Sequence, residues 1–421
     1  MDFRSLPKGP LRLLNVTVPA CLLGEVGDLT RRALTIDGGV IGDGPGVPVD
    51  MGGAMVLPCF IDMHSHLDKG HIWPRSPNPD GTFMGALTTV GADRAARWTA
   101  ADVRARMDFS LRCAYSHGTR AIRTHLDSIP PQDDISFGVF CDMRDDWRGR
   151  IDLQAACLIG AGEFSTDGAF RHTADLVASS GGVLGMVTYP LPDIAARIRA
   201  FLGMAAERGL SVDFHVDETL DATSNTLKMI AQAVLDTGFS APVVVGHCCS
   251  VSAMHEADAL ATLDVVARAG LHVVSLPMCN LYLQDRQAGR TPRMRGITLV
   301  HEMRARGINV SFASDNTRDP FYAYGDMDML EVLREATRIG QLDHSGPGWV
   351  QTALANPARA CGFAAPSLAP GSPADLILFR ARDWNELYAR PQFDRIVMRG
   401  GVPIDRRLPD YAELDPLMRT A

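Results

Sequence analysis

Short apolar runs alternate with segments of helical periodicity from about residue 57 onward, and the alternation repeats eight times. Consecutive strands separated by helices run parallel, because each helical crossover returns the chain to the same end of the sheet. Eight such units match the size of a (β/α)8 barrel, and a doubly wound open sheet is the alternative. The predicted strands end near His64, Asp127, Gly160, Tyr189, Val216, His247, Leu276 and Ser314.

The two ends of the chain have a different pattern. Residues 11–55 and 374–401 contain short strands separated by glycine pairs. We therefore predict a small β-sandwich domain formed by residues 1–56 plus 366–421, beside a barrel domain of residues 57–365. Residues 68–94 are rich in Pro, Gly, Asp and Asn and follow the first barrel strand. A connection of this length predicts a lid or a pocket wall.

The composition indicates a small-molecule partner. The chain has 421 residues, of which 46% are hydrophobic, and its net charge is −8. This charge offers no basic surface for nucleic acid or for an anionic membrane, and no apolar run is long enough to span a bilayer. The nine cysteines show no CxxC spacing, which indicates reduced thiols in a cytoplasmic protein. We also expect a homo-oligomer.

Residues that can bind a metal lie at the ends of four predicted strands. His64 and His66 are two residues apart on the first strand, so their side chains point the same way. His215, His247 and Asp315 end or closely follow the fifth, sixth and eighth strands. Functional side chains of a (β/α)8 barrel gather at the carboxyl ends of its strands, so these residues can meet. Imidazole and carboxylate groups predict a site for Zn²⁺ or Fe²⁺.

With these residues in place, the chain resembles the amidohydrolase superfamily, and within it the cytosine deaminase-like branch that includes the N-isopropylammelide hydrolases. The resemblance rests on residues 58–68 (PCFIDMHSHLD), 123–127 (RTHLD), 215–218 (HVDE), 246–247, 280–284, 295–298, 314–321 (SDNTRDPF) and 370–375. It implies that His64, His66, His215 and Asp315 bind the metal. Two-metal relatives carry a bridging lysine or glutamate at the end of strand four, which residues 183–189 (VLGMVTY) lack. The resemblance therefore implies one divalent ion, Zn²⁺ or Fe²⁺.

The resemblance also implies hydrolytic deamination. A divalent metal lowers the pKa of a bound water from about 15.7 toward 7, which makes hydroxide available. Asp315 would accept the proton of the water, and His247 would hold and polarise the hydroxide. Glu218 would protonate the ring nitrogen beside the attacked carbon and then the departing amine. We expect His125 and Asp127 to support the site or to pack within the barrel.

Three positions differ from the residues with which cytosine deaminases contact the pyrimidine. Gly160 lies near the position of a glutamine, Asn316 replaces an aspartate, and Phe321 replaces a tryptophan. A buried polar edge left unpaired costs about 1–3 kcal/mol per group. We therefore expect a related substrate that releases ammonia, namely another amino-substituted pyrimidine, a triazine or a cyclic amidine.

Two alternatives remain open from the sequence. The first is an N-alkyl aminotriazine substrate of the N-isopropylammelide type, which would release an alkylamine. The second, from another class, is an inert metal-binding barrel that serves as a binding protein. Glu218 argues against the inert barrel, because a binding protein needs no proton shuttle.

Overall fold

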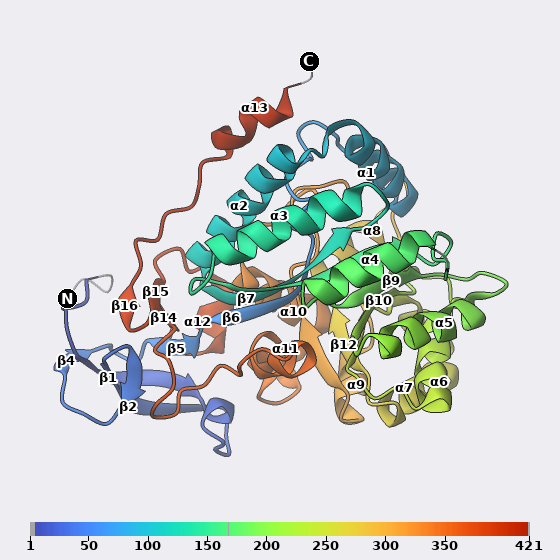
Figure 1. Cartoon of the computed structure of the whole chain (residues 1–421). Coiled ribbons are helices and arrows are strands. Elements are labelled where there is room, and N and C mark those ends of the chain that lie inside the picture. Colours follow the sequence, from blue (N-terminus) through green and yellow to red (C-terminus); the bar gives the residue numbers. More distant parts are fainter. Residues whose placement is uncertain (1–4, 167, 420–421) are drawn as a thin grey trace.

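The computed structural model describes residues 5–166 and 168–419, and eight parallel strands in this part of the chain form a nearly closed barrel (Figure 1). The barrel strands are β6 (Phe60–Ser65), β7 (Thr119–Asp127), β8 (Asp152–Gly160), β9 (Leu184–Thr188), β10 (Val212–Val216), β11 (Val243–His247), β12 (His272–Ser275) and β13 (Asn309–Phe312). The ring closes where the backbone N–H of Asp315 donates to His64 O at 2.8 Å. The predicted (β/α)8 barrel is confirmed, and the doubly wound alternative is excluded.

Helices connect the barrel strands and cover the outside of the barrel. Helix α2 shows how its sequence sets both ends: Thr99 Oγ1 accepts from Asp102 N at 3.3 Å, and Gly118 ends the helix with φ of 95°. No helix within the described residues is long and apolar enough to cross a membrane. The helices are α1 (Phe83–Arg97), α2 (Ala100–His117), α3 (Gln132–Asp146), α4 (Gly168–Ser179), α5 (Ile194–Glu207), α6 (Thr226–Thr237), α7 (Glu256–Arg268), α8 (Pro277–Leu283), α9 (Val300–Ala305), α10 (Met329–Gly340), α11 (Ala355–Cys361), α12 (Trp384–Ala389) and α13 (Asp415–Met418).

A second sheet, built from both ends of the chain, lies beside the barrel (Figure 1). Its strands are β1 (Leu11–Pro19), β2 (Leu29–Asp37), β3 (Val40–Gly42), β4 (Val47–Asp50), β5 (Met55–Pro58), β14 (Leu376–Phe379), β15 (Ile396–Arg399) and β16 (Val402–Pro403). The order is β16-β15-β14-β5-β1-β2-β3, and β4 pairs with β1. The antiparallel pairing of β14 with β5 joins the two ends, as the sequence predicts. The division into two domains near residues 57 and 365 stays a prediction.

The chain after β16 leaves this sheet and runs along the barrel helices to α13 (Figure 1). Arg112 of α2 pairs with Glu413 at 2.7 Å, and Arg75 donates to Leu417 O at 3.2 Å. The second half of the predicted lid, residues 68–94, is helical, because α1 begins at Phe83. The C-terminal segment therefore covers the connection between β6 and α1.

Side chains of a barrel strand alternate between the core under the helices and the barrel interior, as β8 shows. The odd-numbered residues belong to the core that the helices cover: Leu153, Ala155, Cys157 and Ile159. Gln154 faces the interior, where its Oε1 accepts from Arg123 Nε at 2.8 Å and Arg123 Nη1 binds Asp213 Oδ2 at 2.8 Å. Gly160, the last residue of β8, shares the interior-facing positions.

Candidate active site

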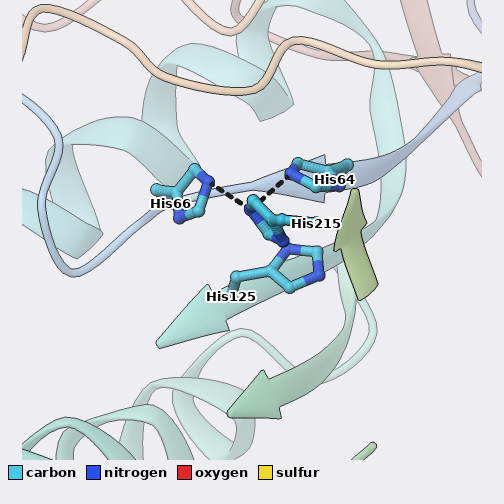
Figure 2. Close-up of side chains that lie close together, drawn as sticks. All are labelled: His64, His66, His125 and His215. Carbon is cyan, nitrogen blue, oxygen red and sulfur yellow. Dashed lines mark hydrogen bonds between the residues drawn. The ribbon is translucent and has the colours of Figure 1, made fainter. Parts of the chain in front are cut away.

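Three histidines from two strands converge at the carboxyl end of the barrel (Figure 2). His64 and His66 project from β6 on the same side, and His215 reaches them from β10. The Nε2 atom of His215 lies 3.1 Å from that of His64 and 3.4 Å from that of His66. Burial lowers the pKa of all three imidazoles well below the usual value for histidine. The rings are therefore neutral at pH 7, which is the form that binds a metal.

Asp315 brings a carboxylate to the same point from the end of the eighth strand. Its backbone is left-handed, with φ of 61°, so the chain turns sharply there. Asp315 Oδ1 lies 3.2 Å from His66 Nε2 and 3.5 Å from His64 Nε2. Both of its carboxylate oxygens are buried without a hydrogen-bond partner among the described residues, and burial raises the pKa of Asp315 to about 7. A cation would satisfy these costly buried groups, so the four side chains fit a divalent metal.

A fourth histidine, His125 of β7, lies against this cluster (Figure 2). Its ring centroid is 4.1 Å from that of His64, and its Nε2 is 3.3 Å from Asp213 Oδ1. One ligand atom from each of His64, His66, His125 and His215 lies within 4.8 Å of the others. Asp213 also binds Arg123, so a buried ion pair fixes the group that faces the His125 ring. The supporting role expected for His125 stays a prediction.

Glu218 and His247 lie beside the predicted metal ligands. Glu218 Oε1 is 3.3 Å from His247 Nδ1 and 3.3 Å from Asn280 Nδ2, which itself lies 2.9 Å from His247 Nδ1. Gln284 Nε2 donates to Glu218 O at 3.1 Å. Burial and the nearby charge of Asp315 raise the pKa of Glu218 well above its usual value. A carboxyl group that keeps its proton at neutral pH can act as a general acid.

The turn after β10 is held by Asp217, the residue before Glu218. Asp217 Oδ1 accepts from Ser224 Oγ at 2.6 Å and from Thr226 Oγ1 at 2.7 Å, and its Oδ2 accepts from Leu227 N at 3.0 Å. These bonds tie the start of α6 to the end of β10. The backbone next to Glu218 is therefore fixed, which positions its carboxyl group beside His247.

The three predicted substrate contacts come from two different parts of the barrel. Gly160 ends β8, whereas Asn316 and Phe321 lie in the connection after β13. The Phe321 ring contacts the Phe83 ring edge to face, with centroids 5.4 Å apart. Asn316 Nδ2 donates to Asp319 Oδ2 at 2.7 Å, so its amide nitrogen is used inside its own loop. Their roles toward a substrate stay predictions.

Lys69 is a candidate functional residue that the sequence reasoning missed. Its side chain is 6% exposed, and its Nζ lies 3.1 Å from Asp127 Oδ1. Asp127 Oδ2 also accepts from Arg94 Nη1 of α1 at 2.8 Å. Burial opposes the charge of Lys69, but Asp127, Asp68 and Asp319 raise its pKa above the usual value for lysine. The sequence signal for Lys69 was its position directly after HSHLD. A lysine is almost never buried unless its charge is paired.

The ammonium of Lys69 has donors to spare. It carries three N–H groups, and across residues 5–166 and 168–419 its hydrogen-bond partner is Asp127. The Nζ atom lies 5.2 Å from the centroid of the Phe321 ring, so the cation sits over an aromatic face. Lys69 thus brings a positive charge and free donors next to a predicted substrate contact.

Comparisons with known proteins show similarity along most of the chain. The profile described as "Amidohydrolase family" matches residues 145–396, more than half of the chain. A pterin deaminase from Rhizobium rhizogenes (strain K84 / ATCC BAA-868) is 51% identical over 420 residues, which is 96% of each chain. An N-isopropylammelide isopropyl amidohydrolase from Pseudomonas sp. (strain ADP) is 22% identical over 332 residues, covering 75% of this chain and 76% of the relative.

A solved structure supports the fold. The 5-methylcytosine deaminase from Klebsiella pneumoniae, liganded with 5-fluorocytosine, aligns with a TM-score of 0.79 and 22% identity over 95% of this chain and 98% of that chain. The barrel and the accompanying sheet are thus shared. The predicted enzyme class, a deaminase of the amidohydrolase superfamily, is confirmed. With its profile match and its relative at 51% identity, the chain belongs to the amidohydrolase family.

Proposed function

We propose that this protein hydrolyses the bond between C2 and the 2-amino group of a pterin, which is a 2-amino-4-oxopteridine, and releases the amino group as ammonia. The observation that carries the proposal is the 51% identity to a pterin deaminase over 96% of both chains. Pterin contains an amino-substituted pyrimidine ring, which is one of the substrate types expected from the sequence. The proposal therefore narrows the predicted substrate to a fused, two-ring heterocycle.

We further propose that His64, His66, His215 and Asp315 hold one divalent ion, Zn²⁺ or Fe²⁺. In four pairs of these side chains, the facing nitrogen and oxygen atoms lie 3.1–3.5 Å apart. When bound, such an ion lowers the pKa of water and so supplies hydroxide at neutral pH. Strand β9 (Leu184–Thr188) ends without a lysine or glutamate, which supports one ion rather than two.

The proton transfers follow from the positions of three side chains. The Asp315 carboxylate accepts the proton of the attacking water. Burial lowers the pKa of His247 to about 3, so this ring stays neutral, and its buried Nε2 has no partner among the described residues and can hold the attacking oxygen. Glu218 protonates the ring nitrogen beside C2 and then the amino group, because the amine leaves as neutral ammonia. Pterin and water thus give the 2-oxo product and ammonia.

The groups around Lys69 suit a flat substrate with an oxo group. Phe321 and Phe83 offer aromatic surface, and the free donors of Lys69 match the 4-oxo oxygen of pterin. Gly160 and Asn316 stay predicted contacts at the other parts of the ring. This arrangement favours a two-ring pteridine over a single-ring substrate, which would leave part of the aromatic surface of Phe321 and Phe83 uncovered.

Ammonia release by metal-analysed protein tests the proposal. We expect turnover of pterin to exceed that of cytosine by orders of magnitude. N-isopropylammelide is the third substrate, and an assay for isopropylamine separates the alkylamine alternative. Protein with a full complement of metal that is inert toward pterin would overturn the proposal, and inertness toward all three substrates would favour the binding-protein alternative.

The cysteines bear on where such an enzyme works. All nine are free thiols, and seven of them are buried. Free thiols persist in reducing compartments, so we propose a cytoplasmic enzyme. Homo-oligomerisation stays a prediction.

A further inference from the structure

The carboxyl end of β8 has no side chain at its interior-facing position, Gly160. A Cβ atom on Gly160 would overlap Glu163 Oε2 and would lie 3.4 Å from Tyr189 Oη. The Cα–Cβ bond gives the direction in which a side chain would extend from residue 160. The Glu163 carboxylate therefore occupies the space that this side chain would fill. A residue three positions further along replaces the missing side chain at the barrel mouth.

Hydrogen bonds hold the turn that folds Glu163 back over Gly160. Gly160 O accepts from the backbone N–H groups of residues 163 and 164, at 3.0 and 3.1 Å. Gly162 N donates to Tyr189 Oη at 2.9 Å, which anchors the turn to the end of the neighbouring strand β9. Arg197 Nη1 donates to the carbonyl oxygens of residues 161 and 164, at 3.0 and 2.8 Å. The backbone that carries Glu163 is thus fixed from three sides.

The Glu163 carboxylate is free to bind a ligand. It is exposed, and it makes no hydrogen bond or ion pair with any other residue that the structure describes. A carboxylate only accepts hydrogen bonds, whereas the glutamine that cytosine deaminases carry near this position both accepts and donates. The two groups therefore recognise different substrate edges.

We propose that Glu163 is a specificity-determining residue whose carboxylate accepts a hydrogen bond from a ring N–H group of the substrate. This inference rests on the proposed deamination of pterin. The attacked carbon C2 of pterin lies between N1 and N3, and the 4-oxo form carries a hydrogen on N3. Glu218 serves N1, and the Glu163 carboxylate accepts the N3–H. A hydrogen bond to a charged acceptor is stronger than one between neutral groups.

The same chemistry disfavours cytosine. Cytosine is attacked at C4. With Glu218 at its N3, the other ring neighbour of the attacked carbon is C5, which carries a C–H group. A C–H group offers the Glu163 carboxylate no comparable hydrogen bond, so this acceptor gains no partner from cytosine. Glu163 therefore selects a heterocycle with an N–H donor at that position over one with a C–H group there.

The test measures kcat/KM for pterin and for 3-methylpterin, in which a methyl group replaces the N3 hydrogen. Glu163→Gln keeps the shape and removes the charge, and Glu163→Ala removes the acceptor. Glu207→Gln is the matched control, because Glu207 is an exposed residue at the end of α5, before β10 begins. Metal content and melting temperature of each variant show that the site is assembled.

With pterin, we expect kcat/KM to fall about 10–100-fold in Glu163→Ala and less in Glu163→Gln. With 3-methylpterin, the wild type should already be impaired, and neither substitution should lower kcat/KM much further. Glu207→Gln should match the wild type on both substrates. An equal loss on both substrates, or no loss on pterin, overturns the role of Glu163 while pterin deamination stands. A wild type inert toward both substrates instead overturns the proposed function together with this inference.

Discussion

Replacement of Glu218 by glutamine separates proton transfer from metal binding. The amide has the size of the carboxyl group, so the contacts of Oε1 with His247 and Asn280, both at 3.3 Å, can persist. An amide cannot give up and recover a proton in the way that a carboxyl group does. Burial and Asp315 keep the pKa of Glu218 high, so the native residue holds the proton that the ring nitrogen needs.

The expected loss follows from this role. A positioned general acid or base contributes about 10²–10⁴-fold to the rate, which corresponds to about 3–5 kcal/mol of activation free energy. We therefore expect kcat of Glu218→Gln to fall by that factor. Metal content should stay at the wild-type level, because Glu218 belongs to neither of the two groups of described residues that are placed to hold a metal ion.

The assay combines ammonia release from pterin with elemental analysis of the same preparation. Glu207→Gln, an identical change at an exposed residue, controls for nonspecific effects of losing a carboxylate. Turnover of Glu218→Gln within a few-fold of the wild type, at full metal occupancy, would refute the assignment of Glu218 as the proton shuttle. Loss of metal from this variant would show that Glu218 belongs to the metal site instead.

Three further changes test other parts of the molecule. His64→Ala should lose bound metal in elemental analysis, and a fully loaded variant would remove His64 from the ligand set. Lys69→Met should lower kcat/KM for pterin about 10-fold through a lost charge-assisted hydrogen bond, and unchanged kinetics would exclude Lys69 from substrate binding. Arg395→Met breaks a buried ion pair with Asp328, whose two oxygens lie 2.7 Å from Arg395 Nη1 and Nη2, and urea denaturation at pH 7 should show a loss of about 3–5 kcal/mol. Although burial opposes it, Arg395 lowers the pKa of Asp328 below its usual 3.8. The pair therefore stabilises the fold fully above pH 3.8 and less as the pH falls further. The difference in unfolding free energy between the wild type and Arg395→Met should shrink in acid, and a pH-independent difference would contradict this.

The meeting of the three histidines could be predicted because these residues obey rules that hold within and at the ends of strands. His64 and His66 share a side of β6 through the two-residue alternation of a strand. His215 lies near the carboxyl end of β10, and in a (β/α)8 barrel the carboxyl ends of all strands, including that of β6, lie at the same face. The 3.1 Å and 3.4 Å contacts between these imidazoles follow from the same two rules.

The substrate side was harder to predict, because its residues lie in turns. Gly160 was expected near a substrate contact, but the return of Glu163 over it depends on hydrogen bonds of a short turn, including one to Tyr189. Lys69 follows β6, where strand alternation no longer applies, and its burial depends on Asp127 from another strand. Distant partners of this kind leave no periodic signal in the sequence.

The most direct test of the central claim uses wild-type protein of known metal content with pterin as substrate. The account predicts one Zn²⁺ or Fe²⁺ per chain, with one ammonia released for each pterin converted to its 2-oxo product. Removal of the metal by a chelator should abolish turnover, and addition of the divalent ion should restore it. Metal-loaded protein that leaves pterin unchanged, or metal-free protein that deaminates it at the full rate, would contradict the account.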